Sequence, residues 1–445
     1  MTSPTVPFLT PVKAQPHTPI YRMHRYFARR PFNVINTLIK YYSRPGDIIL
    51  DPFCGGGTTV VESLRLRRKV IGVDLNPMAT FITRCEVMNL DPEDVETSLE
   101  WLAEITKEES NTLYQTPCPQ CGAEATTNWT KWSVVYICPH CNHPTVTAEA
   151  EKLGPGKYAC THCGKGFHVT NIPRKADKML EQHASCPACG FEGMKQVTAE
   201  DIQRCADLER QFDSIIDREE LWYPQQVMPL DYELRKPNNL ICERFSDFFS
   251  RRNLLALTRL LRRINGIEDQ KMCYFLQHVF TSLLGWTNRM VTDERHGWAL
   301  HAYWLPDIYC ENNVWNILKR RSNWAVRGKQ YSQKEIGDYY VEAHSAADIL
   351  WGNATCWLLT KSSTNLPLPD KSVDAVITDP PYGGNVQYSE LSNFWAVWLP
   401  ETLAVENLIN SPEEAVMKRY KEGEAERFEQ LLGQVFSECC RVLKD

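Results

Sequence analysis

The stretch IILDPFCGGGTTVVESL, residues 48–64, constrains the fold of this chain more than any other part of the sequence. Apolar residues 48–50 predict a short buried strand that Asp51 closes, and a helix is predicted to begin at Thr58. The glycines between them suit a turn that passes close to a ligand, since such a turn has no room for a Cβ and often needs a positive φ. The N–H groups at the helix N-terminus favour a negative group, here a carboxylate. The stretch therefore predicts an α/β fold with a ligand site at this turn.

Two further strand ends carry polar residues. A predicted strand at residues 69–73 ends in Asp74, about 20 positions beyond the turn, where Rossmann-like sites bind ribose hydroxyls. The glycine spacing differs from the G-x-G-x-x-G of dinucleotide enzymes, so the turn alone does not identify the chemistry. More than 300 residues later, the stretch AVITDPPYGG predicts another apolar strand, residues 373–378, followed by Asp379, Pro380, Pro381 and Tyr382.

Together these stretches resemble the motifs D-P-F-x-G-x-G-T-T and D-P-P-Y of the exocyclic-amino DNA methyltransferases, which use S-adenosylmethionine. The segment HRYFARRP, residues 24–31, looks like the part of the cofactor pocket that precedes the glycine turn in that family. Most closely, the whole chain resembles the adenine-specific DNA methylases that carry an inserted zinc ribbon. The resemblance implies a class I (Rossmann-like) methyltransferase sheet, interrupted by a zinc-ribbon stalk and a helical recognition region.

The resemblance also assigns a cofactor site. Asp51 would orient the amino group of the cofactor, the turn from Cys54 to Gly57 would donate backbone N–H groups, and Asp74 would hold the ribose. The segment ILWGNA, residues 349–354, resembles the strand end that contacts the adenine, although Asn353 stands where an acidic residue is usual. The cofactor-binding residues expected in this way are Asp51, Pro52, Phe53, Cys54, Gly55, Gly57, Thr58, Asp74, Asn76, Asn353 and Ala354.

The D-P-P-Y stretch would carry the chemistry. Methylation of an exocyclic amine is hindered because the nitrogen lone pair is delocalised into the ring. A carboxylate and a carbonyl that accept both N–H groups would draw the nitrogen towards tetrahedral geometry and stabilise the developing charge. Asp379 is the expected carboxylate and Pro380 the expected carbonyl, since proline has a fixed φ and no competing N–H. Tyr382 would stack on the flipped-out base; the structural alternative has Asp379 capping its turn and Tyr382 filling the core.

Eight of the 17 cysteines fall in four C-x-x-C pairs, which indicates zinc knuckles rather than disulfides. Two pairs complete a tetrahedron, so two structural zinc ions are predicted in two sequential ribbons. Interleaved pairing, redox dithiols, and a role for the nearby His140, His143, His162 and His183 are alternatives. The predicted zinc ligands are Cys118, Cys121, Cys138, Cys141, Cys160, Cys163, Cys186 and Cys189.

Four segments are predicted. Residues 1–90 carry the cofactor motifs, residues 91–220 a stalk of two paired helices with the zinc ribbons, residues 221–340 a helical target-recognition region, and residues 341–445 the catalytic motif. The family's sheet has seven strands, and only about four can be placed here. The remaining C-terminal strands are expected from an extension or a second chain, because an apolar strand edge would otherwise stay exposed.

Basic residues are clustered although the formal net charge is −6. Arg251, Arg252, Arg259, Arg262 and Arg263 gather around one predicted helix, and a second basic run extends over residues 319–329. These runs favour contacts with DNA phosphates, with a solvated helix face as the alternative. The sequence shows no apolar run of 18 residues and no export leader, and its cysteines are typical of reduced thiols, so a cytoplasmic protein without a membrane span is expected.

The sequence therefore favours transfer of a methyl group from S-adenosylmethionine to N6 of adenine in DNA, in host protection or regulation. Cytosine-N4 is the near alternative, since D-P-P-Y serves both bases. An RNA guanine-N2 methyltransferase and a non-catalytic DNA-binding fragment are the others. Carbon-5 cytosine methylation needs a Pro-Cys nucleophile at a catalytic strand end, which is missing there, so Cys54 is expected to be a bystander.

Overall fold

The computed structural model describes residues 11–235, 242–292, 295–406, 408–418 and 422–445, which form two compact units. The first comprises Met1–Ser98, Gln270–Ser282 and Ser322–Asp445, and the second comprises Leu99–Asp269 and Leu283–Arg321. Residues 221–340, predicted as one recognition region, are divided between the two units. Helix α10 (Val314–Glu335) begins in the second unit and ends in the first.

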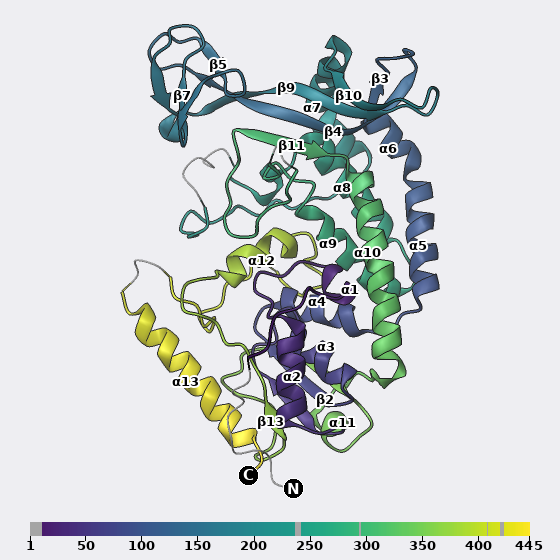
Figure 1. The fold of residues 1–445 in the computed structure, drawn as a ribbon, viewed down its shortest axis with the longest axis vertical. Helices are drawn as coiled ribbons and strands as arrows, with labels where there is room; N and C mark the ends of the chain where they lie inside the picture. The colour runs from purple at the N-terminus through teal and green to yellow at the C-terminus, as the bar shows by residue number, and fades with distance from the viewer. Residues whose placement is uncertain (1–10, 236–241, 293–294, 407, 419–421) are drawn as a thin grey trace. The chain divides into compact units, whose positions relative to one another are not determined.

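The first unit is built around a parallel sheet of four strands in the order β12-β2-β1-β13 (Figure 1). Ile49 in β1 lies opposite Val70 of β2 on one side and Ala375 of β13 on the other. This arrangement confirms the α/β part of the predicted fold class and is consistent with a methyltransferase fold. The strands are β1 (Ile48–Asp51), β2 (Lys69–Asp74), β12 (Cys356–Thr360) and β13 (Ala375–Val376), the last shorter than predicted.

Helices cover both faces of this sheet, because side chains in a strand alternate between faces and all these strands are apolar. Ile48 and Leu50 share one apolar cluster with residues of α13 and α11, whereas α3 and α4 pack against β1, β2 and β12 from the other helical layer. Helix α3 begins at Thr58, as predicted. The helices of this unit are α1 (Pro19–Arg22), α2 (Phe32–Tyr42), α3 (Thr58–Arg65), α4 (Pro77–Val87), α9 (Gln270–Leu284, ending in the second unit), α10 (Val314–Glu335), α11 (Ala346–Leu350), α12 (Tyr388–Ala396) and α13 (Glu424–Val442).

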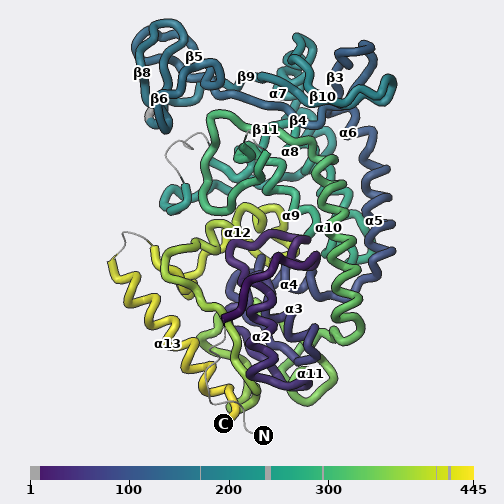
Figure 2. The backbone as a smooth tube through the Cα atoms, in the orientation of Figure 1, coloured from purple at the N-terminus to yellow at the C-terminus, as the bar shows by residue number. Residues whose placement is uncertain are grey.

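The strand order reverses between β1 and β13. From β1 the chain runs to β2 and β12 on one side and returns to β13 on the other. In open α/β sheets, ligands bind outside the carboxyl ends of the strands at such a reversal. The fold therefore directs attention to the loops that follow β1, β2 and β13, and Figure 2 traces the N-terminal (purple) and C-terminal (yellow) parts of the chain that build this unit.

The outer edge of β13 has a partner. Leu443 forms a parallel bridge with Val373, and the Lys444 N–H donates to the Val373 carbonyl at 2.9 Å. The neighbouring Asp374 N–H instead donates to Ile48 of β1, so the two residues face opposite edges. Residues after α13 thus pair where a further strand was expected, and additional strands stay a prediction.

The second unit contains an antiparallel sheet in the order β10-β9-β4-β11. Its central strand β4 has 14 residues, which corresponds to a length of about 45 Å. β3 pairs with the beginning of β4 and β5 with its end, and a separate small sheet of β6, β7 and β8 follows β5. The strands are β3 (Gln115–Pro117), β4 (Glu124–Ile137), β5 (Pro144–Val146), β6 (Lys152–Gly154), β7 (Lys157–Ala159), β8 (Gly166–His168), β9 (Arg174–Ser185), β10 (Glu192–Gln196) and β11 (Ile308–Asn312).

Both helices of the predicted stalk form, and their packing against each other stays a prediction. Both apolar stripes form helices, α5 (Pro92–Ile105) and α7 (Ala199–Arg218), but α7 packs against α8 (Arg251–Asn265). α6 (Lys107–Leu113) also packs against α8. An apolar stripe identifies the buried face of a helix without specifying the partner, so the sequence did not reveal α8 as a neighbour of α7.

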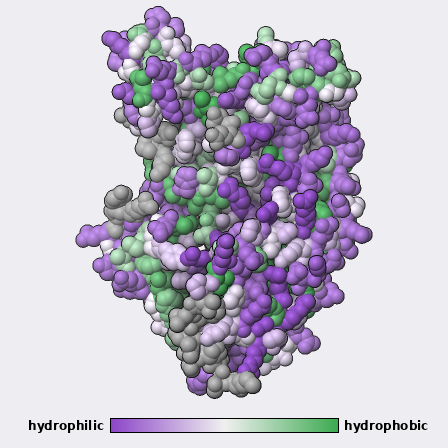
Figure 3. All heavy atoms as spheres, viewed as in Figure 1, coloured by the Kyte–Doolittle hydropathy of each residue, from purple (hydrophilic) through white to green (hydrophobic). Residues whose placement is uncertain are grey.

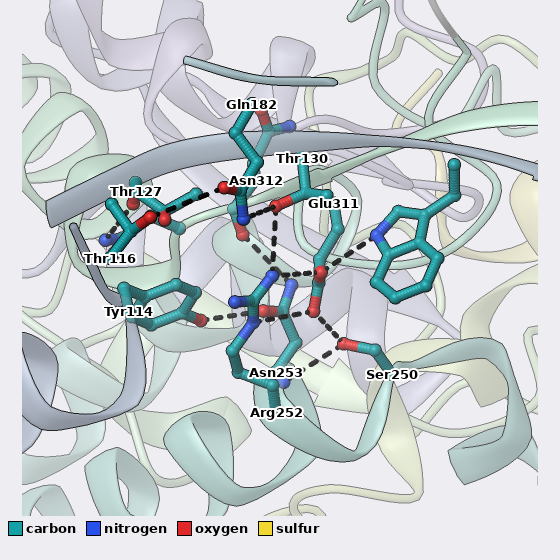
Figure 4. Close-up of polar contacts among 12 residues, drawn as sticks. Tyr114, Thr116, Thr127, Thr130, Gln182, Ser250, Arg252, Asn253, Glu311 and Asn312 are labelled. Atoms are coloured by element: carbon teal, nitrogen blue, oxygen red, sulfur yellow. Dashed lines mark hydrogen bonds and ion pairs between the residues drawn. The ribbon is translucent and has the colours of Figure 1, made fainter. Parts of the chain in front are cut away.

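A buried polar network joins β4 and β11 to the start of α8 (Figure 4). Arg252 forms an ion pair with Glu311 and donates to the Thr130 hydroxyl at 3.1 Å. Asn253 donates to the carbonyl of Asn312 at 3.0 Å and accepts from the Tyr114 hydroxyl at 2.6 Å. Although burial opposes ionisation of Glu311, the Arg252 guanidinium holds its pKa below the usual value.

Glu311→Gln is expected to lower the free energy of unfolding by about 3–5 kcal/mol, because Arg252 would keep its buried charge without a carboxylate. The matched control is Glu209→Gln, whose partner Arg251 lies 3.5 Å away in an exposed pair, so that a loss of only about 0–1 kcal/mol is expected. Urea unfolding followed through the second unit measures both. Equal losses in the two variants would contradict a stabilising role of the buried pair.

Hydrophilic side chains cover most of the face seen in Figure 3, with apolar ones scattered between them. Among the described residues, no helix combines the length and apolarity that crossing a bilayer requires.

Candidate functional site

A pocket lies at the carboxyl ends of the parallel strands. Its walls come from the segment before α2, the loops after β1, β2, β12 and β13, residues 413–416, and α13. Two motifs that lie more than 300 residues apart therefore share one pocket. Of the residues predicted from sequence, the lining includes Pro52, Phe53, Gly55, Asp74, Asn76, Asp379 and Pro381.

The glycine turn is closed by hydrogen bonds within the protein. The Cys54 N–H donates to the Val73 carbonyl at 3.0 Å, the Gly57 N–H to the Cys54 carbonyl at 2.8 Å, and the Gly55 N–H to the Asp74 carboxylate at 2.8 Å. The prediction that these three N–H groups serve the cofactor is therefore wrong, because each already has an acceptor.

The glycines make room for another part of the chain. A Cβ at Gly56 would lie 2.6 Å from Nε of Arg29 and 2.9 Å from Cβ of Tyr26. Gly57 has a φ of +80°, and a Cβ there would lie 2.7 Å from the Thr83 hydroxyl. The segment at residues 24–31 thus packs directly on Gly56, and Thr83 of α4 packs on Gly57, which accounts for the glycines at these two positions.

Asp74 is held in place at the end of β2. Its carboxylate accepts the N–H groups of Gly55 and Asn76, at 2.8 and 2.9 Å. Asn76 begins α4 as its N-cap by accepting from the Met78 N–H at 3.0 Å, and its amide donates to Ser392 at 2.6 Å. Burial raises the pKa of Asp74 to about 6, against the lowering effect of the two N–H donors. The carboxylate keeps oxygen lone pairs for a ligand in the pocket.

Asp51 has a different role from the one predicted. It is buried, it is not part of the pocket lining, and it accepts from the Thr378 hydroxyl at 2.6 Å and the Phe53 N–H at 3.1 Å. It thereby joins the carboxyl ends of β1 and β13 rather than facing a ligand. Thr378 was missed from the sequence, although its position at the end of the catalytic strand was a signal.

Cys54, Gly57 and Thr58 also lie outside the lining. Burial raises the pKa of the Cys54 thiol well above its usual range, so the thiol stays protonated and unreactive at neutral pH. This agrees with its expected role as a bystander.

The D-P-P-Y loop presents a carboxylate with two partners. Asp379 lines the pocket and accepts from Nε of Arg30 at 2.7 Å. The Tyr382 hydroxyl also contacts Asp379 and Arg30, and the hydrogen bond to Asp379 raises the pKa of Tyr382. Tyr382 is 48% exposed and therefore does not fill the core. Pro380 and Tyr382 adjoin the lining without belonging to it.

The adenine-contact assignment for Asn353 and Ala354 is wrong. Both residues precede β12, at the amino end of the strand, and Asn353 is exposed. Since the pocket lies at the carboxyl ends, β12 contributes to it through residues 362–364 instead. The resemblance misplaced the strand by about its own length, because residues 349–350 end helix α11.

Sequence reasoning also missed an aromatic wall. Tyr26 and Tyr388 both line the pocket, with their ring centroids 6.5 Å apart and the rings stacked. Glu414, another lining residue, accepts the Ser389 N–H at 2.9 Å at the start of α12. Tyr26 lies within residues 24–31, whose resemblance to a cofactor-pocket segment could have identified it as a pocket residue. No sequence motif marked Tyr388 or Glu414.

The eight paired cysteines of the second unit form two tetrads. Cys118, Cys121, Cys186 and Cys189 make one, and Cys138, Cys141, Cys160 and Cys163 make the other. The measured sulfur–sulfur distances are 3.6 and 3.8 Å in the first tetrad and 3.6 and 3.9 Å in the second. A tetrahedral zinc with four thiolates at about 2.3 Å requires sulfurs about 3.8 Å apart, so both tetrads fit this ion.

The tetrads correct the expected pairing. The first C-x-x-C pair joins the fourth and the second joins the third, a nested arrangement, because β4 and β9 are antiparallel and bring these pairs together at the two ends of β4. Each knuckle is followed by a residue with positive φ: Gly122, Asn142, Gly164 and Gly190. The nearby histidines have other partners: His143 stacks on His162, His183 on Trp129, and His140 contacts the Gly166 carbonyl.

The first basic run is largely neutralised within the protein, which contradicts a helix face turned to DNA phosphates. Arg259 pairs with Glu219 at 2.6 Å and Arg263 with Glu109 at 3.0 Å. Arg262 donates to the Glu219 carbonyl at 2.6 Å, and Arg251 and Arg252 pair with Glu209 and Glu311. The acidic partners come from distant parts of the sequence, so composition could not reveal them.

The second run is also partly buried. Lys329 is 1% exposed and donates to the Met88 carbonyl at 2.7 Å, and Arg320 lies over the Trp286 ring at 4.2 Å.

Comparisons with known proteins agree with the motif at the glycine turn. Residues 8–82 match the DNA methylase family model for N6 and N4 methyltransferases. The chain is 33% identical over 94 residues to the Type II methyltransferase M.MjaII of Methanocaldococcus jannaschii, which covers 21% of this chain and 16% of the relative. It is 41% identical over 49 residues to the Type II methyltransferase M.EcaI of Enterobacter cloacae, 11% of each chain.

These matches span less than a fifth of either relative. No solved structure matches the chain with significance. Residues 8–82 are therefore similar to the DNA methylases, and the matched relatives are Type II methyltransferases.

Proposed function

We propose that this chain is a DNA methyltransferase that transfers a methyl group from S-adenosylmethionine to N6 of adenine. The observation that carries the proposal is the single pocket lined by Gly55 of the glycine turn, Asp74 at the end of β2 and Asp379 after β13. Support also comes from the match of residues 8–82 to the DNA methylases. This function requires two partners, DNA and S-adenosylmethionine. It requires no membrane.

The pocket suits the cofactor by the chemistry of its walls. Asp74 offers carboxylate oxygens to ribose hydroxyls, and Phe53 and Tyr26 offer apolar and aromatic surface to an adenine ring. S-adenosylmethionine, when bound, supplies an electrophilic methyl group. Tyr26 and Ala28 from the segment at residues 24–31, together with residues 413–416, add further lining to the pocket.

Asp379 and the Pro380 carbonyl would act on the amine. Both are acceptors, and together they orient the two N–H bonds so that the nitrogen lone pair turns towards the methyl group. The carboxylate also stabilises the positive charge that develops on nitrogen. Tyr382, which is exposed beside Asp379, offers its ring face to the flipped base. Adenine N6 and cytosine N4 present the same amine, so this chemistry extends to cytosine.

The two tetrads would each hold one structural zinc ion. Four thiolates close a tetrahedral site and leave no open position for substrate, so the ions would stabilise the two ends of the paired strands β4 and β9 rather than take part in transfer.

Cofactor affinity is expected to fall as the pH decreases through about 6, because Asp74 must be ionised to accept two ribose hydroxyls and its pKa is raised to about 6. Asp74→Asn should weaken binding roughly ten- to a hundredfold, the effect of losing hydrogen bonds to a charged group, and should remove most of this pH dependence. Calorimetric titration with S-adenosylmethionine between pH 5 and 8 measures both effects.

The Asp74 variant is needed because burial also raises the pKa of Asp51 to about 6. An unchanged affinity in Asp74→Asn, or a pH dependence that persists in full, would contradict the assignment of Asp74 to the ribose. Absence of any cofactor binding by the wild-type protein would contradict the proposed function.

A further inference from the structure

Arg30 occupies the position at Asp379 that the proposed reaction needs for another group. Its Nε donates to Oδ2 of Asp379 at 2.7 Å, and its Nη2 contacts the Tyr382 hydroxyl. The guanidinium carbon lies 5.0 Å from the centroid of the Tyr382 ring. A planar, N–H-bearing group therefore sits over the ring and donates to the carboxylate.

Those two contacts are the ones proposed for the target base. An exocyclic amine is an sp² nitrogen on a planar ring; it would donate its N–H to Asp379 while the ring stacks on Tyr382. A guanidinium has the same planarity and the same donors. Since the guanidinium lies over the ring, a base cannot stack on the same face of Tyr382 while Arg30 stays in place.

We infer that the Arg30 guanidinium is an internal stand-in for the target base, and that the base must displace it to reach Asp379. The inference rests on the proposed function and adds to it a residue that opposes base entry. Arg30 satisfies the catalytic carboxylate while no base is present and leaves when one enters.

The two neighbouring arginines show why Arg30 is the displaceable one. Arg29 is anchored: its side chain is 5% exposed, it pairs with Glu86, which is 0% exposed, and it donates to the Tyr21 carbonyl at 3.2 Å. Arg30 and Asp379 are 47% and 27% exposed, and an ion pair so open to water favours its paired form by no more than about fivefold. Arg29 therefore fixes the backbone from which the Arg30 side chain reaches, and displacing that side chain costs little.

The test compares methyl transfer by the wild-type protein, Arg30→Ala and Arg30→Lys, using labelled S-adenosylmethionine and unmethylated genomic DNA. If the stand-in form makes up about four-fifths of the free protein, its removal lowers the KM for DNA about fivefold without lowering kcat. The lysine variant should lie between the two, because an ammonium is not planar. Arg44→Ala, which changes an exposed arginine before β1 at the opposite end of the sheet, is the matched control and should behave as wild type.

Methylguanidinium then provides a second readout. It should bind to Arg30→Ala, raise its KM for DNA towards the wild-type value as a competitor, and have no such effect on wild type or Arg44→Ala. Ligand-observed NMR should show the binding in Arg30→Ala and its loss in Arg30→Ala combined with Asp379→Asn.

Three results would overturn the inference. A fall in kcat at constant KM in Arg30→Ala would place Arg30 in the reaction itself, and a raised KM would make it a DNA contact. Equal methylguanidinium binding by Arg30→Ala and wild type would show that the Arg30 side chain does not occupy a guanidinium site at Asp379. If neither the wild type nor any variant transferred methyl groups, the proposed function would be contradicted. The NMR experiment would still show whether Arg30 occupies a guanidinium site at Asp379.

Discussion

Asp379→Asn is expected to lower the rate of methyl transfer by at least about 10²–10³-fold, the loss typical of removing one preorganised group that stabilises developing charge. The amide keeps the size of the side chain but replaces one acceptor oxygen by a donor and removes the negative charge. Affinity for S-adenosylmethionine should change little, since the proposed contact of Asp379 is with the amine. Transfer of labelled methyl groups and calorimetric cofactor titration measure the two quantities separately.

The control for this variant is Asp370→Asn, an exposed carboxylate before β13 that pairs with Arg441. It should keep both rate and cofactor affinity. If Asp379→Asn and Asp74→Asn lost cofactor binding to the same extent, the division of roles between the ends of β2 and β13 would be wrong.

Zinc analysis of double cysteine variants should distinguish the nested pairing from the sequential one. The wild-type protein is expected to hold two zinc ions per chain. Cys118→Ser with Cys186→Ser removes two ligands of the same tetrad and should leave one ion, whereas Cys118→Ser with Cys138→Ser damages both tetrads and should leave none. Sequential ribbons would give one ion in the second double variant. Structural zinc binding is worth about 10–16 kcal/mol in small zinc domains. Each lost ion should therefore also unfold the end of the paired strands β4 and β9 that its tetrad adjoins.

Cys205→Ser with Cys440→Ser serves as the matched control, because neither cysteine belongs to a tetrad. It should retain both ions. Less than one zinc per wild-type chain under reducing conditions would contradict the zinc assignment as a whole.

Local sequence signals predicted the frame of the site well. The apolar run at Ile48–Leu50, its closing Asp51 and the helix start at Thr58 all appear in the structure where the sequence placed them. Asp74 and Asp379 line one pocket as well, because the carboxyl ends of parallel strands meet at one edge of a sheet. These features depend on a few consecutive residues, which is why sequence could reveal them.

Features that depend on distant partners were not predictable in this way. The Gly55 N–H donates to Asp74, at the end of another strand. The Arg30 side chain donates to Asp379, in a loop almost 350 residues away. The cysteine spacing allowed several pairings, and only the antiparallel course of β4 and β9 selects one. The sequence around Arg252 indicates a candidate DNA contact, but its ion-pair partner Glu311 lies 59 residues further along the chain.

The most direct test of the central claim is nucleoside analysis of unmethylated DNA and of RNA after incubation with the protein and isotope-labelled S-adenosylmethionine. The account predicts labelled N6-methyladenine in DNA, abolished by Asp379→Asn and retained by Asp370→Asn. Labelled N4-methylcytosine would keep the proposed chemistry and correct the base. Label found only on N2 of guanine in RNA, or no labelled nucleoside from a protein that binds the cofactor, would contradict the account.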